Sequence, residues 1–208
     1  MERTVEIDPV GSRESCGSDC PTFVAKWEPW WREQCLEPLA LLATDEYLER
    51  VGQKTRNMVS KARRLYTFGE FDYNDQLDGI YEVNLSKPFR QGQRMSYGYR
   101  ERPRPISRPQ ETCHRHRSSW WGAWDADGAL RGYVNLVILN EVGVVNTILG
   151  HADASAVVNG LFAHLATYAG VDWIHYLTFR TSRPSLAEFK LRVGFREYRA
   201  SLPTGVAA

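Results

Sequence analysis

The segment NLSKPFRQGQRMSYGY, residues 84–99, concentrates polar side chains around Pro88 and Gly92. Arginine guanidinium groups present fork-shaped donors that match phosphate or carboxylate oxygens, so Arg90 and Arg94 are predicted to hold such a group. Donors gathered around a proline and a glycine are typical of a binding loop rather than of a core element. The candidate substrate-binding and catalytic residues of this segment are Asn84, Ser86, Arg90, Gln91, Arg94 and Tyr99.

Positive charge accumulates in and after this segment. Between Lys87 and Arg117, nine Lys or Arg residues face two acids, an excess of +7 in a chain whose net charge is +1. Phosphate is an obvious partner, and nearby aromatic rings such as Tyr97 and Trp120 offer faces on which bases stack. DNA, tRNA and a nucleotide-tailed cofactor all fit this pattern. The alternative is a solvated loop in which some arginines pair with the acids of residues 70–82.

His151 is the first candidate for a general base. It follows Gly150 at the end of the apolar strand VVNTIL, residues 144–149. An unperturbed imidazole pKa of about 6.5 lets it accept a proton near neutral pH. In the alternative interpretation, His151 caps the following helix or bonds a neighbouring backbone carbonyl. His116, in the sequence HRHR, is either a second candidate base or a part of the basic surface.

The C-terminal half supplies the elements that position these residues. Residues 119–199 predict the order strand, turn, strand, strand, helix, strand, helix, strand. Asp127-Gly128 forms the turn between the first two apolar runs. On the helix predicted over residues 153–168, apolar residues recur on one face, which is expected to pack against the sheet.

Three stretches of this half resemble the GNAT acyltransferase fold: SSWWGAWDADGALRGYVNLVIL, VVNTILGHADASAVVNGLFAHLATYAG and SLAEFKLRVGFREY. In GNAT enzymes, as the resemblance implies, a splayed strand leads into a glycine-rich Q/R-x-x-G-x-G/A loop. Its backbone N–H groups hold the pyrophosphate of acetyl-CoA at a helix N-terminus. The resemblance therefore implies acetyl-CoA or another acyl donor bound near Leu149, Gly150 and Ser155. It also implies an α/β fold, with a GNAT-like mixed splayed central sheet and flanking helices, preceded by a helical N-terminal region.

Two positions depart from the family pattern. The loop after the strand has one glycine, which comes early, and Asp153 places negative charge where the pyrophosphate would lie. Many GNAT enzymes carry an acidic tyrosine four residues before the glycine of the terminal Gly-Phe pair, and Lys190 occupies that position here. Tyr176, on the preceding strand, and Tyr198 are candidate replacements, and Tyr99 is a further candidate catalytic residue.

The chain is also similar to the Fem-like aminoacyltransferases. These proteins share the fold, take the acyl group from an aminoacyl-tRNA and need no pyrophosphate loop. The predicted function is acyl transfer to an amine, with an amine on a modified nucleic-acid base, as in phage DNA modification, as one acceptor. The alternatives are aminoacyl-tRNA-dependent transfer and a catalytically inactive GNAT-like module that binds nucleic acid.

The N-terminal part is predicted to be helical. Apolar residues recur from Phe23 to Leu42 at three- and four-residue steps. A basic helix is predicted from about Asp45 to Tyr66, with its charges either solvated or in contact with phosphate. Next come a strand, a turn and a helix that ends before Pro88, since the residue before a proline avoids helical geometry. The predicted organisation is a flexible tail at 1–22, a helical region at 23–66, a GNAT-like domain at 67–200 and a tail at 201–208.

Composition sets the remaining bounds. A chain of 208 residues with 43% hydrophobic residues can bury one sizeable core. No apolar run reaches the roughly 18 residues that a membrane-spanning helix needs, and the N-terminus has no apolar signal-peptide core. These features predict a soluble protein of the cytoplasm, or of the host cytoplasm if the protein is viral. They predict no particular oligomeric state.

Four cysteines favour a reduced compartment over a disulfide framework. Cys16 and Cys20 could join Cys113, His114 or His116 in a zinc site, because thiolates and imidazoles are zinc ligands. Structural ligand pairs usually have tighter spacing, however, and Cys16 lies in the Gly/Ser-rich stretch GSRESCGSDCP. No metal site is therefore predicted.

Overall fold

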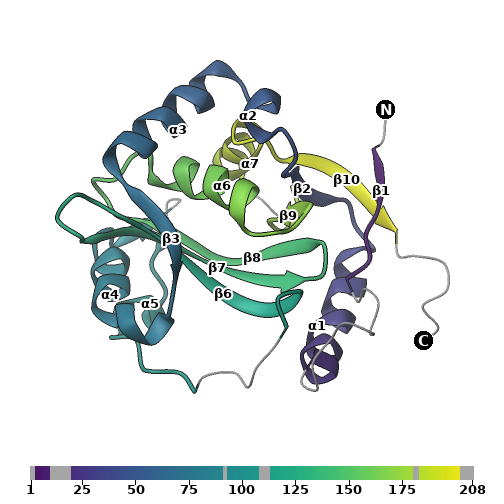
Figure 1. The fold of residues 1–208 in the computed structure, drawn as a ribbon, viewed down its shortest axis with the longest axis horizontal. Helices are drawn as coiled ribbons and strands as arrows, with labels where there is room; N and C mark the ends of the chain where they lie inside the picture. Colours follow the sequence, from purple (N-terminus) through teal and green to yellow (C-terminus); the bar gives the residue numbers. More distant parts are fainter. Residues whose placement is uncertain (1–2, 10–19, 91–92, 108–112, 180–182, 202–208) are drawn as a thin grey trace.

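The protein folds around one eight-stranded mixed sheet with helices on both of its faces (Figure 1). A computed structural model describes residues 3–9, 20–90, 93–107, 113–179 and 183–201. The strands of the sheet are β1 (Thr4–Glu6), β2 (Leu39–Ala43), β3 (Thr67–Phe71), β6 (His116–Trp124), β7 (Leu130–Leu139), β8 (Val142–Gly150), β9 (Trp173–His175) and β10 (Arg196–Ser201). The helices are α1 (Cys20–Gln34), α2 (Tyr47–Arg50), α3 (Gln53–Leu65), the 3₁₀-helix η2 (Tyr73–Gln76), α4 (Leu77–Leu85), α5 (Tyr97–Arg100), α6 (Val157–Tyr168) and α7 (Pro184–Arg192). A separate hairpin joins β4 (Phe89–Arg90) to β5 (Gln93–Arg94).

The sheet opens between β8 and β9. The strand order is β1-β10-β2-β9-β8-β7-β6-β3, in which β8 runs parallel to β9, β1 runs parallel to β10, and the other pairs are antiparallel. The pairing of β8 with β9 extends from Val142 to Val144, whereas β8 runs on to Gly150. The splayed mixed sheet that the sequence predicts is therefore confirmed.

The predicted order of elements in the C-terminal half is also confirmed, from β6 to β10. One boundary differs, because α6 begins at Val157 rather than near Asp153. The intervening residues form turns, in which Ala154 N–H donates to the His151 carbonyl at 3.1 Å and Val157 N–H donates to the Ala154 carbonyl at 3.2 Å. Asp153 therefore lies outside the helix, with 78% of its side chain exposed.

The helical prediction for residues 36–42 is wrong, because Leu39–Ala43 forms β2 inside the sheet. Leu39 and Leu41 pack on the face covered by α1, and Ala40 and Leu42 pack on the face covered by α6. A strand buried on both faces reads as a continuous apolar run, and periodicity does not distinguish such a run from a buried helix. The region predicted to be helical therefore contributes a central strand to the sheet.

The other N-terminal elements partly follow the prediction. The basic helix predicted from Asp45 to Tyr66 is divided into α2 and α3, and Gly52 is the N-cap residue of α3. Part of the predicted tail at 1–22 is ordered, since β1 pairs with β10. The strand, turn and helix before Pro88 are confirmed as β3, η2 and α4.

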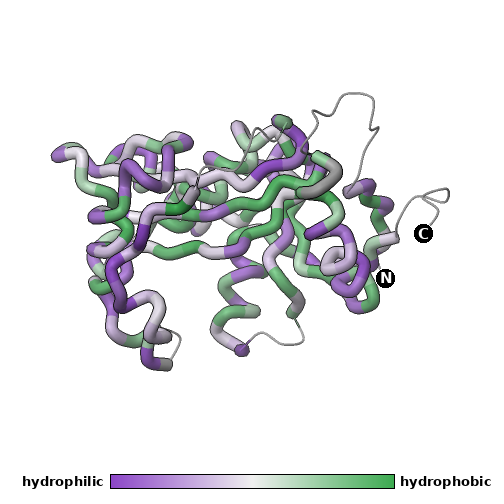
Figure 2. The backbone as a smooth tube through the Cα atoms, turned by 90° about the horizontal axis from the view of Figure 1, so that it is seen from below, coloured by the Kyte–Doolittle hydropathy of each residue, from purple (hydrophilic) through white to green (hydrophobic). Residues whose placement is uncertain are grey.

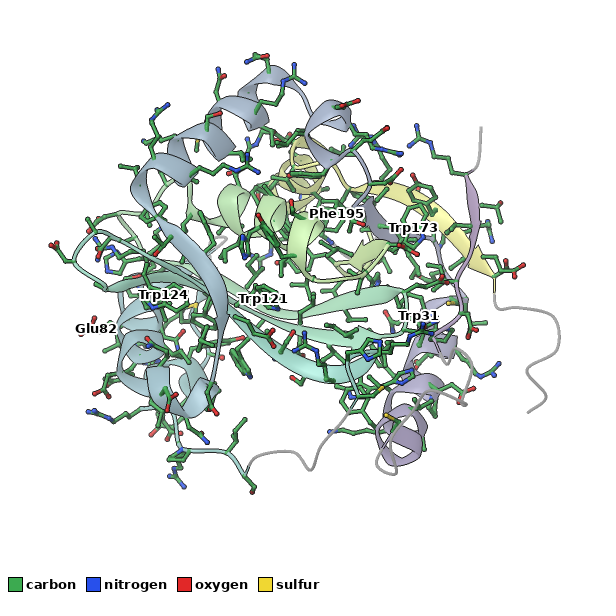
Figure 3. The ribbon with its side chains drawn as sticks, viewed as in Figure 1. Trp31, Glu82, Trp121, Trp124, Trp173 and Phe195 are labelled. Atoms are coloured by element: carbon green, nitrogen blue, oxygen red, sulfur yellow. The ribbon has the colours of Figure 1, made fainter. Side chains whose placement is uncertain are left out.

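Three apolar clusters hold the helices to the sheet, and the smallest packs Ile80 and Val83 of α4 against Leu130 and Tyr133 of β7. The largest lies between the sheet and α3, α6 and α7, where the rings of Phe162 and Phe195 meet edge to face at 5.2 Å. The third lies against α1 and is centred on Trp31, which is fully buried (Figure 3). Hydrophobic segments run through the middle strands, and hydrophilic segments lie toward the outer elements (Figure 2). Among the described residues, none of the helices combines the length and the apolar character that crossing a membrane requires.

Candidate functional site

Two adjoining cavities lie where the sheet opens. They have volumes of about 310 and 560 Å³, in the range of small-molecule sites, and both are lined by Lys87, Gly150, Val158 and Phe189. The smaller cavity reaches toward α3, and the larger one extends along the end of β8 to Tyr176. The opening of the sheet therefore provides one continuous candidate site.

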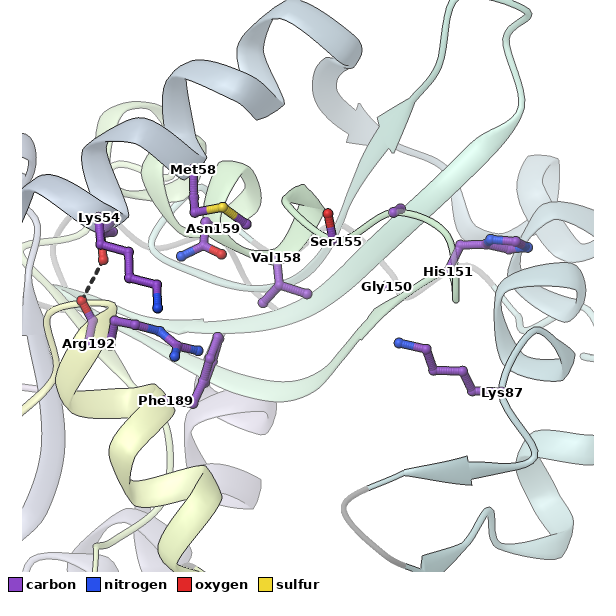
Figure 4. Close-up of a pocket in the computed structure, with 12 residues that line it drawn as sticks. Lys54, Met58, Lys87, Gly150, His151, Ser155, Val158, Asn159, Phe189 and Arg192 are labelled. Atoms are coloured by element: carbon purple, nitrogen blue, oxygen red, sulfur yellow. Dashed lines mark hydrogen bonds between the residues drawn. The ribbon is translucent and has the colours of Figure 1, made fainter.

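The smaller cavity is cationic. Lys54 of α3, Lys87 after α4 and Arg192 at the end of α7 all line it. Lys54 and Arg192 lie together on one side, and Lys87 lies with His151 on the opposite side (Figure 4). Thr55 Oγ1 donates a hydrogen bond to the Arg192 carbonyl at 2.7 Å, which joins α3 to α7 and fixes the first pair of cations.

The same cavity lies at the N-terminus of α6. Ser155, Val158 and Asn159 line it, and Ala156, which has no polar side-chain atom to cap the helix, is the N-cap residue. The first backbone N–H groups of a helix and its dipole favour anions. Together with the three cations, this end of the cavity is suited to a phosphate group.

His151 lies at the mouth of the smaller cavity, with 19% of its side chain exposed. Its Nδ1 is 3.3 Å from the backbone N–H of Asp153 and 3.8 Å from the Asp153 carboxylate. When Nδ1 accepts the N–H, Nε2 carries the proton. When Nδ1 carries the proton and faces the carboxylate, Nε2 becomes the basic atom. The backbone N–H and the carboxylate of Asp153 thus both approach Nδ1, and each favours a different tautomer of His151.

Tyr176 lines the larger cavity and is a protonated hydroxyl donor at neutral pH. Burial raises the pKa of Tyr176, and the nearby Tyr99 raises it further. Tyr99 Oη in turn lies 3.5 Å from Thr147 Oγ1 on β8. Tyr99, which contacts β8, and Tyr176, which follows β9, are therefore near each other at the opening.

Lys190, at the position of the missing tyrosine, is fully buried. Its Nζ donates to the Thr178 carbonyl at 3.0 Å and lies 4.9 Å from the centre of the Tyr176 ring. Burial lowers the pKa of Lys190 to about 8, so the ammonium remains largely charged at neutral pH. The ammonium therefore contacts the ring of Tyr176, a lining residue of the larger cavity.

The lowered pKa of Lys190 predicts a pH dependence of stability. Between pH 8 and 10.5 the unfolded chain keeps the Lys190 proton that the folded chain has lost, so the free energy of unfolding is expected to rise. The expected rise is about 2 to 3 kcal/mol relative to Lys190→Met, which cannot titrate. Urea unfolding of both proteins from pH 7 to 10 measures it. Parallel curves for the two proteins would show that the Lys190 pKa is unperturbed.

Five of the predicted residues line the two cavities: Leu149, Gly150, His151, Ser155 and Tyr176. Tyr198, a candidate acid, is not among them. It packs on Trp173, with ring centres 5.1 Å apart, in the cluster that contains Trp31.

Two residues of the 84–99 segment make internal hydrogen bonds instead of facing the cavities. Asn84 is buried and accepts from the Tyr133 hydroxyl at 2.6 Å. Ser86 Oγ accepts from Ala152 N–H at 3.0 Å and donates to the Val83 carbonyl at 2.7 Å. Both side chains therefore hold α4 against its neighbours.

Two further predicted substrate-binding residues, Arg94 and His116, do not line the cavities. Arg94 is exposed on β5. Gln91 and the Arg90 side chain lie outside the described residues. His116 is 1% exposed and pairs with Leu139, at the opposite end of β7 from the cavities. Of the basic segment that begins at Lys87, Lys87 lines the cavities, whereas Arg94 and His116 lie away from them.

The alternative interpretation of the basic segment is confirmed for two arginines. Arg102 forms an ion pair with Asp78, and Arg117 forms one with Glu70. Sequence reasoning missed Arg192 and Phe189, because nothing in the local sequence of α7 indicates that it reaches the end of β8. Lys54 belongs to the basic helix for which a phosphate contact was one of two interpretations.

Comparison with known proteins indicates the fold. Neither a protein-family model nor a curated protein matches the chain. The solved structure of FemX superposes with a TM-score of 0.58 at 10% identity, covering 78% of this chain and 59% of FemX. The C-terminal domain (DUF2156) of a protein from Agrobacterium fabrum, described as a lysylphosphatidylglycerol synthetase, superposes with a TM-score of 0.50 at 14% identity. That match covers 85% of this chain and 69% of the domain. The chain has a divergent GNAT-like fold with Fem-like similarity.

Proposed function

We propose that this protein transfers an acyl group from a phosphate-bearing donor to an amine. The observation that carries the proposal is that Lys54, Lys87 and Arg192 line one cavity at the N-terminus of α6, beside the end of β8, with Lys87 facing the other two across it. In this arrangement the three cations replace the missing glycines as the anchor of the donor. The acyl group would then extend into the larger cavity, which Ile148, Phe89 and Phe189 make partly apolar.

The transfer needs a base, an acid and donors for the oxyanion. His151 takes a proton from the acceptor ammonium, and the freed amine attacks the acyl carbonyl carbon. A C–N bond forms, the bond between that carbon and the leaving sulfur or oxygen breaks, and Tyr176 protonates the leaving atom. The nitrogen, positively charged after the attack, releases its second proton to the Tyr176 phenolate, and the protonated His151 returns its own proton to solvent. The end of β8, which continues past its pairing with β9, provides backbone N–H groups near the carbonyl oxygen.

Aminoacyl-tRNA-dependent transfer is the second candidate. The observation that favours it is the replacement of a glycine-rich loop by three side-chain cations, since these can hold a phosphate of many donors. The Fem-like similarity of the fold points the same way. The Agrobacterium fabrum domain is described as part of a lysylphosphatidylglycerol synthetase. By analogy, the transferred group would be lysine and the acceptor a phospholipid. Exposed cations such as Arg94 and Arg104 would instead bind the phosphates of a nucleic acid, one of whose bases carries the acceptor amine.

The proposal predicts that each cation of the cavity contributes to donor affinity. Lys54→Ala, Lys87→Ala and Arg192→Ala are each expected to raise the Kd of the true donor by about 10- to 100-fold, because each removes a charge-assisted hydrogen bond. The measurement is titration calorimetry with acetyl-CoA, and fluorescence anisotropy with aminoacyl-tRNA over a salt series.

Lys61→Ala is the matched control, because Lys61 is exposed on the same helix as Lys54 and does not line the cavity. Equal losses for Lys54→Ala and Lys61→Ala would refute a specific phosphate site. Tight nucleic-acid binding with no turnover of either donor would instead support the inactive binding module.

A further inference from the structure

A second cluster of reactive side chains lies at the opposite end of the sheet. Cys20 begins α1, Cys113 precedes β6, and His116 is the first residue of β6. One Sγ or ring nitrogen from each of the three lies within 4.8 Å of the other two. Cys20 and His116 are each 1% exposed, and Cys113 is half-buried. The cluster therefore brings two thiols and an imidazole together in a largely buried position. Its members are up to 96 residues apart in the sequence.

The spacing of these atoms suits a tetrahedral ion. Cys113 Sγ lies 3.5 Å from His116 Nδ1. With a Zn–S bond of about 2.3 Å and a Zn–N bond of about 2.0 to 2.1 Å, the corresponding edge of a zinc tetrahedron is about 3.6 Å. An ion could therefore enter between these two ligand atoms with little movement of the chain.

The hydrogen bonds around the cluster also favour metal binding. His116 Nε2 lies 3.3 Å from the Pro9 carbonyl, and donation to this carbonyl leaves the lone pair on Nδ1, which faces Cys113. Zinc-bound histidines commonly make this second hydrogen bond to a backbone carbonyl. Cys113 N–H is 3.4 Å from Cys20 Sγ and would stabilise a thiolate there. The imidazole tautomer and the sulfur environment thus both favour metal binding.

We propose that Cys20, Cys113 and His116 bind a Zn²⁺ ion that joins the N-terminal segment to the sheet. The ion would tie the start of α1, and through Pro9 the residues after β1, to the first residue of β6. His116 pairs with Leu139 and Gly150 pairs with Gly132, so the ion lies about 23 Å along β7 from the acyl-transfer cavity. At this distance the role of the ion is structural rather than catalytic, and it is independent of the proposed function.

In the sequence, the wide spacing of Cys16 and Cys20 and the Gly/Ser-rich stretch around Cys16 argue against a zinc site. Cys16 lies outside the described residues. The three described ligands come from two distant segments, and their convergence rather than the Cys16 spacing supports the site. A water or a further protein ligand would complete the tetrahedron.

The test begins with metal analysis of the full chain, purified with a reductant and without chelators. About one zinc ion per chain is expected, and Cys20→Ser, Cys113→Ser and His116→Asn should each lose it. Cys35→Ser is the matched control and should retain the ion. Cys35 is also a half-buried thiol near α1, but burial raises its pKa to about 11 and it is not a member of the cluster.

Cobalt gives a second readout, which begins with the wild-type protein. Wild-type protein refolded with Co²⁺ should show a thiolate-to-cobalt charge-transfer band in the near ultraviolet, together with visible bands of a tetrahedral ion. The band should shrink in Cys113→Ser, the least buried of the three positions. Reduced wild-type protein that holds no zinc and shows no charge-transfer band would overturn the proposal. An unchanged band in Cys113→Ser would overturn it equally.

Discussion

His151→Asn is expected to lower kcat by about 100- to 10,000-fold, the usual contribution of a general base. Asparagine keeps an acceptor oxygen near the Asp153 N–H, which His151 Nδ1 approaches at 3.3 Å, but it cannot take a proton. The turn before α6 should therefore survive while the chemistry is lost. Steady-state kinetics with the donor that binds best, combined with a thermal melt, measures both effects.

The same substitution separates the two interpretations of His151. A histidine that only caps the turn would give nearly wild-type kcat in His151→Asn and a lowered melting temperature in His151→Ala. A base would give a large loss of kcat in both variants. Asp153→Asn provides a further control. It removes the carboxylate 3.8 Å from Nδ1 and should lower kcat less than either histidine variant, because it changes only the tautomer balance.

Tyr176→Phe is expected to produce the second large effect, a loss of kcat of up to about 10,000-fold. The raised pKa of Tyr176 keeps its hydroxyl protonated, and so able to act as an acid, throughout the neutral range. The size of the loss should depend on the donor. A thiol, with a pKa of about 8.5, leaves more readily than a ribose hydroxyl and needs less help from an acid. A loss near 100-fold would therefore indicate a thioester donor, and a larger loss an aminoacyl ester.

Phenylalanine is a conservative test because it keeps the ring of Tyr176 among its neighbours. The ring lies 5.9 Å from that of Phe195 and 4.9 Å from Lys190 Nζ, and these contacts do not involve the hydroxyl. Tyr198→Phe is the matched control, since Tyr198 packs on Trp173 away from the cavities. Equal rates for Tyr176→Phe and wild type, with both proteins equally stable, would exclude Tyr176 as the acid.

The two sites of the molecule can be tested separately. The cavity lies where β8 leaves β9, and the cysteine–histidine cluster lies beyond the far end of β7. Loss of zinc should therefore lower stability, whereas loss of the cavity cations should lower donor affinity. A variant that affects one property and spares the other would support this separation.

The sequence by itself determined the order of elements from β6 to β10, and the resemblance it carries implied the splayed sheet. It also placed the end of α4 before Pro88. These features depend on apolar periodicity, turn residues and the geometry before proline, all of which act over a few neighbouring residues. His151 and Tyr176 could be predicted as site residues for the same reason, since each lies near the end of a strand that the sequence predicts.

Only the tertiary structure decided which distant residues meet. It placed β2 between β9 and β10, where an apolar run buried on both faces had the appearance of a helix. It brought Lys54, Lys87 and Arg192 to one cavity, and Cys20, Cys113 and His116 to one cluster. Such convergence depends on how α1, α3 and α7 pack against the sheet. That packing results from the burial of many side chains together, and it cannot be predicted from any short stretch of sequence.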